Sequence, residues 1–257
     1  MKKNEQNKKD SSWGKVANWY DELLEGDDDT YQTQVILPNL MRILELKPGE
    51  KVVDIACGQG FFSRACLKEG ASPTGADIST ELIKIAREKT GREIPFYVAQ
   101  SHKLDFAKDS SFDTALIILA IQNIEQMDAT FAEVGRVLKM GGRMIIVLNH
   151  PAFRVPKHSS WEFDNDQQIQ YRRVDKYLSG EKVMIDMHPG MKNSEKTISY
   201  HRSLQDISKS LRKNGFVISR LEEWISHRSS EKGPRQKTED VARKEIPLFM
   251  ALEIRRA

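Results

Sequence analysis

The sequence has few cysteines, no long apolar run and almost no excess of charge. Two cysteines in 257 residues exclude a disulfide-stabilised scaffold and fit a reducing, cytoplasmic compartment. No stretch of about 18 apolar residues occurs, so we expect no membrane-spanning helix. The chain start "MKKNEQNKKDSS" has no apolar stretch behind its lysines. We therefore expect no secretory signal, and we interpret residues 1–12 as a disordered basic tail.

The balance of charge gives little support for a nucleic-acid-binding protein. The 40 basic and 37 acidic residues leave a formal net charge of +3. Basic residues gather in the N-terminal tail and in residues 227–245, but acidic residues are mixed into both segments. These segments indicate solvated surfaces more than an RNA-binding patch, so we disfavour nucleic acid as a partner.

From residue 51 the chain alternates apolar runs with amphipathic segments. We expect strands at 51–56, 72–79, 94–101, 112–121, 143–151, 216–224 and 246–256. We expect helices at 61–70, 79–91, 127–142 and 203–215. Asp128 is the expected cap of the third helix, Gly141 and Gly142 its end, and Ser203 with Asp206 a capping box for the fourth. This alternation predicts an α/β fold with a doubly wound, mostly parallel, seven-stranded Rossmann-like sheet.

The remaining segments predict additions to this sheet. Two helices are expected before residue 51, with Pro38 as a kink or a helix restart. We divide the chain into the tail 1–12, a cofactor-binding half 13–150, an inserted substrate cap 151–202 and a closing part 203–257. The cap is polar, rich in aromatic residues, His and Met, and contains three expected short strands. The polar stretch between the last two strands is expected to be a long surface loop.

The segment "KVVDIACGQGFFSRACLKEG" has the pattern of a buried strand, a glycine turn and a helix. In an open α/β sheet such a turn lies at the carboxyl ends of the strands, where ligands bind. Gly58 and Gly60 allow the backbone to approach a ligand closely. Asp54, at the strand end, would repel a pyrophosphate, but it would attract the ammonium and sulfonium of S-adenosylmethionine. Asp77 ends the second strand and can accept both ribose hydroxyls of an adenosine cofactor, without choosing between the two classes.

Five motifs in order make a family resemblance specific. They are "VVDIACGQG", "GADIS", "VAQSHKLDF", "FDTALIILAIQNI" and "LKMGGRMIIV". Together they resemble the class I S-adenosylmethionine-dependent methyltransferases, and the small-molecule branch of that family is the most similar. The resemblance extends over about residues 13–256, and residues 151–202 look like the variable substrate cap of that branch.

The resemblance implies a role for each matching residue. Asp54, Ala56, Gly58 and Gly60 would line the methionine end of S-adenosylmethionine, with Ala56 replacing the first glycine of the turn motif. Asp77 would hold the ribose and Ile78 would pack on the adenine. Gln100 would accept the adenine amino group, and Ser101 would offer its backbone N–H. Leu119, Ala120 and Ile121 would face the methyl donor. An aromatic lid of Trp13, Trp19, Tyr20 and Tyr31 would cover the cofactor; the alternative is the apolar face of two N-terminal helices.

Several polar residues are candidates for the chemistry. His150, at the end of the fifth strand, and Tyr200 and His201, where the cap returns, are candidate catalytic bases, with a hydrogen-bonded structural role as the alternative for each. His158 and His188 are weaker candidates within the cap. The histidine spacing matches no zinc pattern, so we expect no metal. Cys57 is interpreted as a packing residue. The sequence "QNIE" after the fourth strand lacks the Asn/Asp-Pro-Pro-aromatic motif of nucleic-acid adenine methyltransferases.

We therefore predict an S-adenosylmethionine-dependent methyltransferase that acts on a small molecule, with an aromatic or lipid-like acceptor as one hypothesis. An NAD(P)-dependent oxidoreductase is the alternative enzyme. It would use Gly58, Gly60 and Ser63 as a degenerate fingerprint, and Asp54 disfavours it. A non-catalytic RNA- or protein-binding module on the same fold is the third hypothesis.

Overall fold

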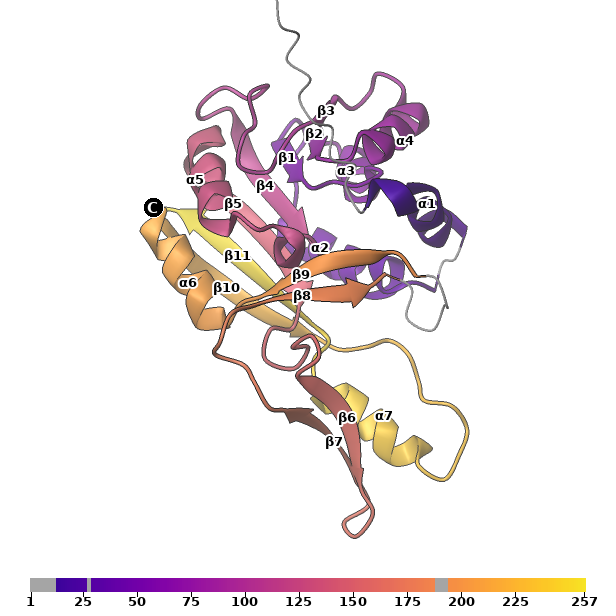
Figure 1. Ribbon diagram of the computed structural model, residues 1–257. Coiled ribbons are helices and arrows are strands. Elements are labelled where there is room, and N and C mark those ends of the chain that lie inside the picture. The colour runs from indigo at the N-terminus through magenta and orange to yellow at the C-terminus, as the bar shows by residue number, and fades with distance from the viewer. Residues whose placement is uncertain (1–12, 27–28, 188–193) are drawn as a thin grey trace, which may run out of the picture.

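The computed structural model describes residues 13–26, 29–187 and 194–257. Its centre is a seven-stranded sheet with the strand order β10-β11-β5-β4-β1-β2-β3 (Figure 1). The parallel strands are β1 (Lys51–Ile55), β2 (Ser72–Asp77), β3 (Phe96–Val98), β4 (Phe112–Ile118) and β5 (Leu138–Asn149). Strand β11 (Phe249–Arg256) pairs antiparallel with both β5 and β10 (Phe216–Trp224). The predicted fold class is confirmed, whereas the predicted tail 1–12 lies outside the described residues.

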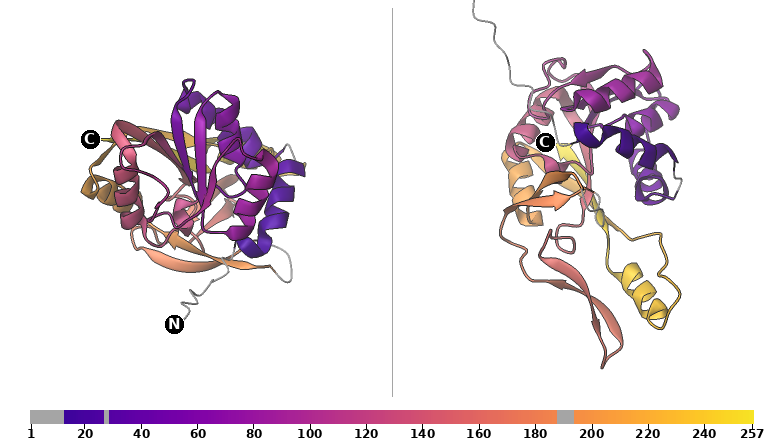
Figure 2. Two further views of the ribbon diagram at one scale, coloured as in Figure 1. Left: turned by 90° about the horizontal axis from the view of Figure 1, so that it is seen from above. Right: turned by 45° about the vertical axis from the view of Figure 1, so that its right-hand side comes forward.

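Helices cover both faces of the sheet (Figures 1 and 2). One face carries α1 (Ala17–Gly26), α2 (Leu37–Leu44), α3 (Phe61–Lys68) and α4 (Thr80–Thr90), and the other carries α5 (Met127–Val137) and α6 (Leu204–Lys213). Side chains alternate between the faces along each strand. In β1, Val52 packs in the α2–α3 cluster, whereas Val53 and Ile55 pack in the α5–α6 cluster. Burial on both faces explains why the central strands are near-continuous apolar runs.

Two details of the predicted helices are corrected. Helix α5 follows the N-cap Gln126, so Asp128 is its second residue rather than its cap. The Asp128 carboxylate instead accepts hydrogen bonds from Ser210 and Lys213 of α6. The helix ends at Val137 and not at the two glycines, because Leu138 is extended and pairs with β4. The capping box of α6 is confirmed, and Pro38 lies in the first turn of α2, after a π-helical segment Gln32–Ile36.

The cap region contains four strands rather than three. Strands β6 (Ser159–Asp164) and β7 (Ile169–Val174) form one hairpin, and β8 (Glu181–Asp186) and β9 (Lys196–His201) form another. The predicted loop between the last two strands is wrong, because it contains helix α7 (Gln236–Glu245), which packs against β7. The sequence of α7 has no apolar stripe, and of its residues only Ala242 is buried. Contacts such as Arg235 over the Phe163 ring, at 4.1 Å, hold the segment in place.

The second hairpin crosses the carboxyl ends of the parallel strands (Figure 1). Its β9 strand lies against a 3-10 turn, η3 (Ile121–Asn123), that follows β4. The Asn123 amide donates to the Ile198 carbonyl at 3.0 Å, and Lys182 pairs with Glu125 at 3.1 Å. The first hairpin and α7 project away from the sheet (Figures 1 and 2). The hairpin β8–β9 therefore covers the edge where ligands bind in such sheets.

Among the helices that the structure describes, none has both the length and the apolar character that crossing a membrane would require.

We predict that Gly75→Ala lowers the free energy of unfolding by about 1–3 kcal/mol. A methyl group on Gly75 would overlap the Phe96 ring and approach Cys57 Sγ to 2.9 Å. Urea denaturation measures the change. Gly233→Ala is the matched control, because nothing lies within 4 Å of the added methyl group. Equal stability of the two variants would contradict the tight packing of β2 against β3.

Candidate active site at the carboxyl ends of the strands

A cavity opens where β1, β2 and β4 end. Including its mouth, it measures about 800 Å³, within the range of small-molecule sites. We call it the strand-end cavity. Its wall comes from α1, the turn after β1, the end of β2 and the segment after β4. The lining residues are Trp13, Tyr20, Leu24, Asp54, Ala56, Cys57, Gly58, Gln59, Phe61, Phe62, Asp77, Ile78, Leu82, Ile118, Leu119, Ala120, Asn123 and Ile124. The crevice lies between β1 and β4, where the strand order of the sheet reverses.

Asp54 places a buried carboxylate in the strand-end cavity. Its side chain is 2% exposed, and Ser63 Oγ donates a hydrogen bond to Oδ2 at 2.6 Å. Burial, with a smaller contribution from the nearby Asp77 carboxylate and against the lowering effect of the Ser63 hydrogen bond, raises the pKa of Asp54 to about 7. The ionised form of Asp54 is therefore costly without a positive partner.

Asp77 joins the ends of two strands. Its Oδ2 accepts the Gly58 N–H at 3.0 Å and its Oδ1 accepts the Ser79 N–H at 2.8 Å. Burial also raises the pKa of this carboxyl. No cationic side chain contributes to the pKa shift of Asp54 or Asp77. A ligand with positive charge would supply the missing partner, whereas a pyrophosphate would add to the repulsion.

Two residues other than glycine adopt left-handed backbone conformations at this cavity. Ala56 has φ +57° and Leu119 has φ +53°, and both line the wall. Such conformations cost energy for residues with a Cβ and gather at functional sites. Gly58 also lines the cavity, with φ +56°. Gly60 begins α3 behind the wall, where an added Cβ would lie 2.7 Å from the Phe96 ring.

The N-terminal helical segment supplies part of the aromatic cover. Trp13 and Tyr20 line the cavity, and their rings meet edge to face at 5.5 Å. Burial and the neighbouring Asp77 raise the pKa of Tyr20 to about 12, so its hydroxyl stays protonated. Ile78 also lines the cavity and is 57% exposed. Trp19 and Tyr31 lie outside this lining, and the Tyr31 ring instead contacts Phe249.

Gln100 and Ser101 lie beyond the residues that line the strand-end cavity. The Gln100 backbone pairs with Lys103, and the side chain is exposed. Ser101 Oγ lies 2.9 Å from Thr130 Oγ1. Their contacts with adenine, inferred from the resemblance, stay predictions.

A second cavity, of about 440 Å³, lies between the cap and the sheet. We call it the cap cavity. It is lined by Ile121, Gln122, Met127, Leu148, Asn149, Pro151, Arg154, Pro156, Ser199, Tyr200, His201, Arg202 and Ile207. Ile121 and Gln122 directly follow Ala120 of the strand-end cavity, so one short segment separates the two.

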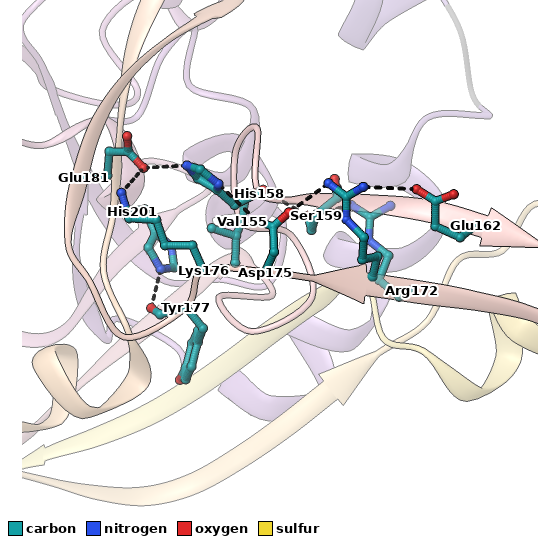
Figure 3. A network of polar contacts seen from close by, with 11 residues as sticks. Val155, His158, Ser159, Glu162, Arg172, Asp175, Lys176, Tyr177, Glu181 and His201 are labelled. Atoms are coloured by element: carbon teal, nitrogen blue, oxygen red, sulfur yellow. Dashed lines mark hydrogen bonds and ion pairs between the residues drawn. The ribbon is translucent and has the colours of Figure 1, made fainter.

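Two of the three candidate bases line the cap cavity. Tyr200 lies between the cations of Lys182 and Arg202, at 5.4 and 5.2 Å from its ring centre. His201 Nε2 lies 2.6 Å from the Tyr177 carbonyl oxygen (Figure 3). Since a carbonyl only accepts, Nε2 carries the proton and the lone pair is on Nδ1.

His150 does not line the cap cavity, and both of its ring nitrogens are hydrogen-bonded. The Ala152 N–H donates to its Nδ1 at 3.3 Å, and its Nε2 donates to Glu223 at 2.7 Å. The residue is 5% exposed, and burial lowers its pKa. This geometry supports the hydrogen-bonded structural role that the sequence left open for His150.

His158 connects the two hairpins of the cap (Figure 3). Its Nδ1 lies 3.1 Å from Asp175 and its Nε2 lies 2.9 Å from Glu181, which also pairs with Lys176. His188 lies outside the described residues. No group of three or more His, Cys, Asp or Glu side chains in the described ranges could hold a metal ion. Burial raises the pKa of the Cys57 thiol, which disfavours a reactive thiolate.

Comparison with known proteins decides the family. Residues 53–146 match the family profile described as a methyltransferase domain. The crystal structure of an S-adenosylmethionine-dependent methyltransferase from Mesorhizobium loti superimposes with a TM-score of 0.69 and 26% identity, over 85% of this chain and 96% of the other. These two matches bear out the predicted resemblance to the class I S-adenosylmethionine-dependent methyltransferases.

Two relatives in sequence add detail. A demethylmenaquinone methyltransferase of Corynebacterium kroppenstedtii is 38% identical over 103 residues, which are 40% of this chain and 43% of the relative. The matched region thus spans less than half of that relative's length. An uncharacterised protein of Methanocaldococcus jannaschii is 29% identical over 79% of this chain and 76% of its own.

Sequence reasoning missed the arginines of the cap cavity. Arg154 follows β5, and Arg202 follows β9; neither belongs to a motif. The Arg202 guanidinium donates to the carbonyls of Ile121, Ile124 and Glu125, so it holds the segment between the two cavities. No local signal distinguishes these residues from other surface arginines.

The raised pKa of Asp54 predicts a pH-dependent loss of stability in this methyltransferase without ligand. A group with a higher pKa in the folded chain stabilises fully below its unfolded pKa, and this contribution is lost as the pH rises through the folded value. A shift from 3.8 to about 7 corresponds to a loss of up to about 4 kcal/mol between pH 4 and pH 8. We expect Asp54→Asn to remove this loss, as measured by urea denaturation at each pH.

The control for this experiment is Asp105→Asn, which changes an exposed carboxylate that pairs only with Lys103 at 3.5 Å. Its pH profile should run parallel to that of the wild type. Parallel profiles for Asp54→Asn and the wild type would show that Asp54 ionises normally.

Proposed function

We propose that this protein transfers a methyl group from S-adenosylmethionine to a small-molecule acceptor. The observation that carries the proposal is the pair of buried carboxylates, Asp54 and Asp77, in a cavity that otherwise has a mainly apolar wall and no cationic side chain paired with either of them. S-adenosylmethionine supplies an activated methyl group on a cationic sulfonium and also carries an ammonium group. Similarity to the methyltransferase family supports the same cofactor.

Different residues of the cavity would bind different parts of S-adenosylmethionine. Asp54, beside the left-handed turn at Ala56, would face the ammonium end of the cofactor. Asp77 would accept the ribose hydroxyls while it keeps its bonds to Gly58 and Ser79. Ile78 would pack on the adenine, and Tyr20 would close the side of the cavity. A charge-assisted hydrogen bond of this kind contributes roughly 1.5–3 kcal/mol.

Alignment and exclusion of water would carry most of the rate enhancement. Orientation of two reactants contributes roughly 7–11 kcal/mol to lowering a barrier. The hairpin β8–β9, within the proposed substrate cap 151–202, covers the strand ends and would position the acceptor in the cap cavity. His201, with its lone pair on Nδ1, is the best-placed group to accept a proton from the acceptor. A general base adds about 10²–10⁴-fold when the acceptor must lose a proton.

The acceptor is proposed to contain an apolar ring. Six apolar side chains of the cap cavity support this: Ile121, Met127, Leu148, Pro151, Pro156 and Ile207. Relatives named for demethylmenaquinone, such as that of Corynebacterium kroppenstedtii, agree with a small-molecule acceptor. An NAD(P)-dependent reaction is disfavoured, because an ionised Asp54 would repel a pyrophosphate.

A ligand panel tests the cofactor. We expect S-adenosylmethionine and S-adenosylhomocysteine, but not NAD or NADP, to raise the melting temperature, since a ligand at 100 times its Kd stabilises by about 2.7 kcal/mol. Ile78→Asp should abolish the rise without unfolding the protein, because Ile78 is 57% exposed. Val217→Asp is the matched control, with 53% exposure on β10, away from the cavity.

A rise with NAD alone would replace the methyltransferase proposal with the oxidoreductase. Production of S-adenosylhomocysteine from S-adenosylmethionine in the presence of ring-containing acceptors then tests the transfer itself. We expect His201→Ala to lower kcat more than it changes KM for acceptors that must lose a proton, and to change the rate little for acceptors that are already ionised.

A further inference from the structure

Arg154 lies in the wall of the cap cavity without a negative partner. Its Nε is buried and has no hydrogen-bond partner. Among the ion pairs of the residues that the structure describes, none includes the Arg154 guanidinium. The guanidinium lies over the Trp161 ring, 5.8 Å from the ring centre. A partly buried charge in this state is costly, so its partner is expected to come from outside the chain.

Other cations surround Arg154 and increase that cost. Arg172 lies over the same Trp161 ring at 5.4 Å. Burial, together with the charges of Arg172 and Arg243 and against the opposite effect of Tyr31, lowers the pKa of Arg154 to about 10. No carboxylate appears among these influences. His150, whose pKa is lowered by burial and by the charge of Arg154, is already bonded to Glu223.

In the part of the chain that the structure describes, the neighbouring arginines have hydrogen-bond partners, and the side chain of Arg154 has neither a hydrogen-bond nor an ion-pair partner. Arg172 donates to the Phe153 carbonyl at 2.8 Å and to Ser159 Oγ at 2.9 Å. Arg243 Nε donates to Ser230 Oγ at 2.9 Å. Arg172 also lies on β7. Contacts of His158 with Asp175 and Glu181 connect the end of this strand to the second hairpin (Figure 3). Arg154 is therefore the arginine with donors available to a ligand.

We propose that Arg154 binds an oxyanion of the methyl acceptor, a carboxylate or a phosphate group. The apolar body of the acceptor would fill the cap cavity toward Ile121 and Gln122, beside the strand-end cavity. A guanidinium matches either oxyanion with two parallel hydrogen bonds. A neutral ring system alone would leave Arg154 without a partner. This inference rests on the proposed function, since it assigns the cap cavity to the acceptor.

Binding of small anions tests the assignment. Isothermal titration uses the full chain with saturating S-adenosylhomocysteine, and the probes are benzoate, phenyl phosphate, inorganic phosphate and the neutral benzyl alcohol. The variants are Arg154→Gln and Arg154→Lys. Arg173→Gln is the matched control on the same strand as Arg172, because Arg173 is exposed and pairs with Glu162 and Asp175.

We expect benzoate or phenyl phosphate to bind at least 10-fold more tightly than benzyl alcohol. Arg154→Gln should weaken this binding by about 10-fold or more, Arg154→Lys by less, and Arg173→Gln by no more than twofold. Trp161 fluorescence should respond to the anion in the wild type, and Trp161→Phe should remove the response. Arg154→Gln should melt at or above the wild-type temperature, because it removes an unpaired charge.

Three results would overturn the inference: equal binding of acid and alcohol, anion binding unaffected by Arg154→Gln, or absence of binding by every anionic probe. Inorganic phosphate binding as tightly as phenyl phosphate would assign the site to a free anion instead of the acceptor. Titration of S-adenosylhomocysteine alone separates the two proposals. Its failure would contradict the proposed function, whereas its success together with failure of the anions would contradict only the role of Arg154.

Discussion

The site depends on one carboxylate that holds two strand ends together. Asp77 accepts the N–H of Gly58 in the turn after β1 and the N–H of Ser79 at the start of α4. These bonds fix the turn that carries Ala56 in its left-handed conformation, and they place a second negative charge beside Asp54. Both carboxylates are buried, and no cationic side chain of the described residues influences their pKa values. The site therefore favours a positively charged ligand.

The cap shows how a site can be assembled from weakly structured parts. Each hairpin has only two strands, too few to be stable alone. Ion pairs of His158 with Asp175 and Glu181 connect the hairpins, and α7 supports β7 although it follows β10 in the chain. Hydrogen bonds of Arg202 and Asn123 then attach the hairpin β8–β9 to the segment after β4. The shape of the cap cavity is thus a property of contacts between distant segments.

Charge divides the two cavities. The strand-end cavity contains acidic side chains and the cap cavity contains basic ones, with the short segment at Ile121 between them. With the proposed ligands, such an arrangement would orient a cationic donor and an anionic acceptor toward each other and disfavour exchange of their positions. The match to the methyltransferase family profile covers residues 53–146, which include most of the strand-end cavity but neither Arg154 nor Arg202 of the cap cavity.

The sequence by itself determined the sheet and the cofactor turn. Their signals are local: apolar runs such as residues 112–118, the capping box at Ser203, and carboxylates at strand ends, where parallel topology brings Asp54 and Asp77 together. Tertiary structure decided the rest. It made a helix of residues 236–245, which have no apolar stripe, and it bound His150 to Glu223 from a strand 73 residues away. It also left Arg154 without a partner, because burial and pairing depend on distant chain segments that no local pattern encodes.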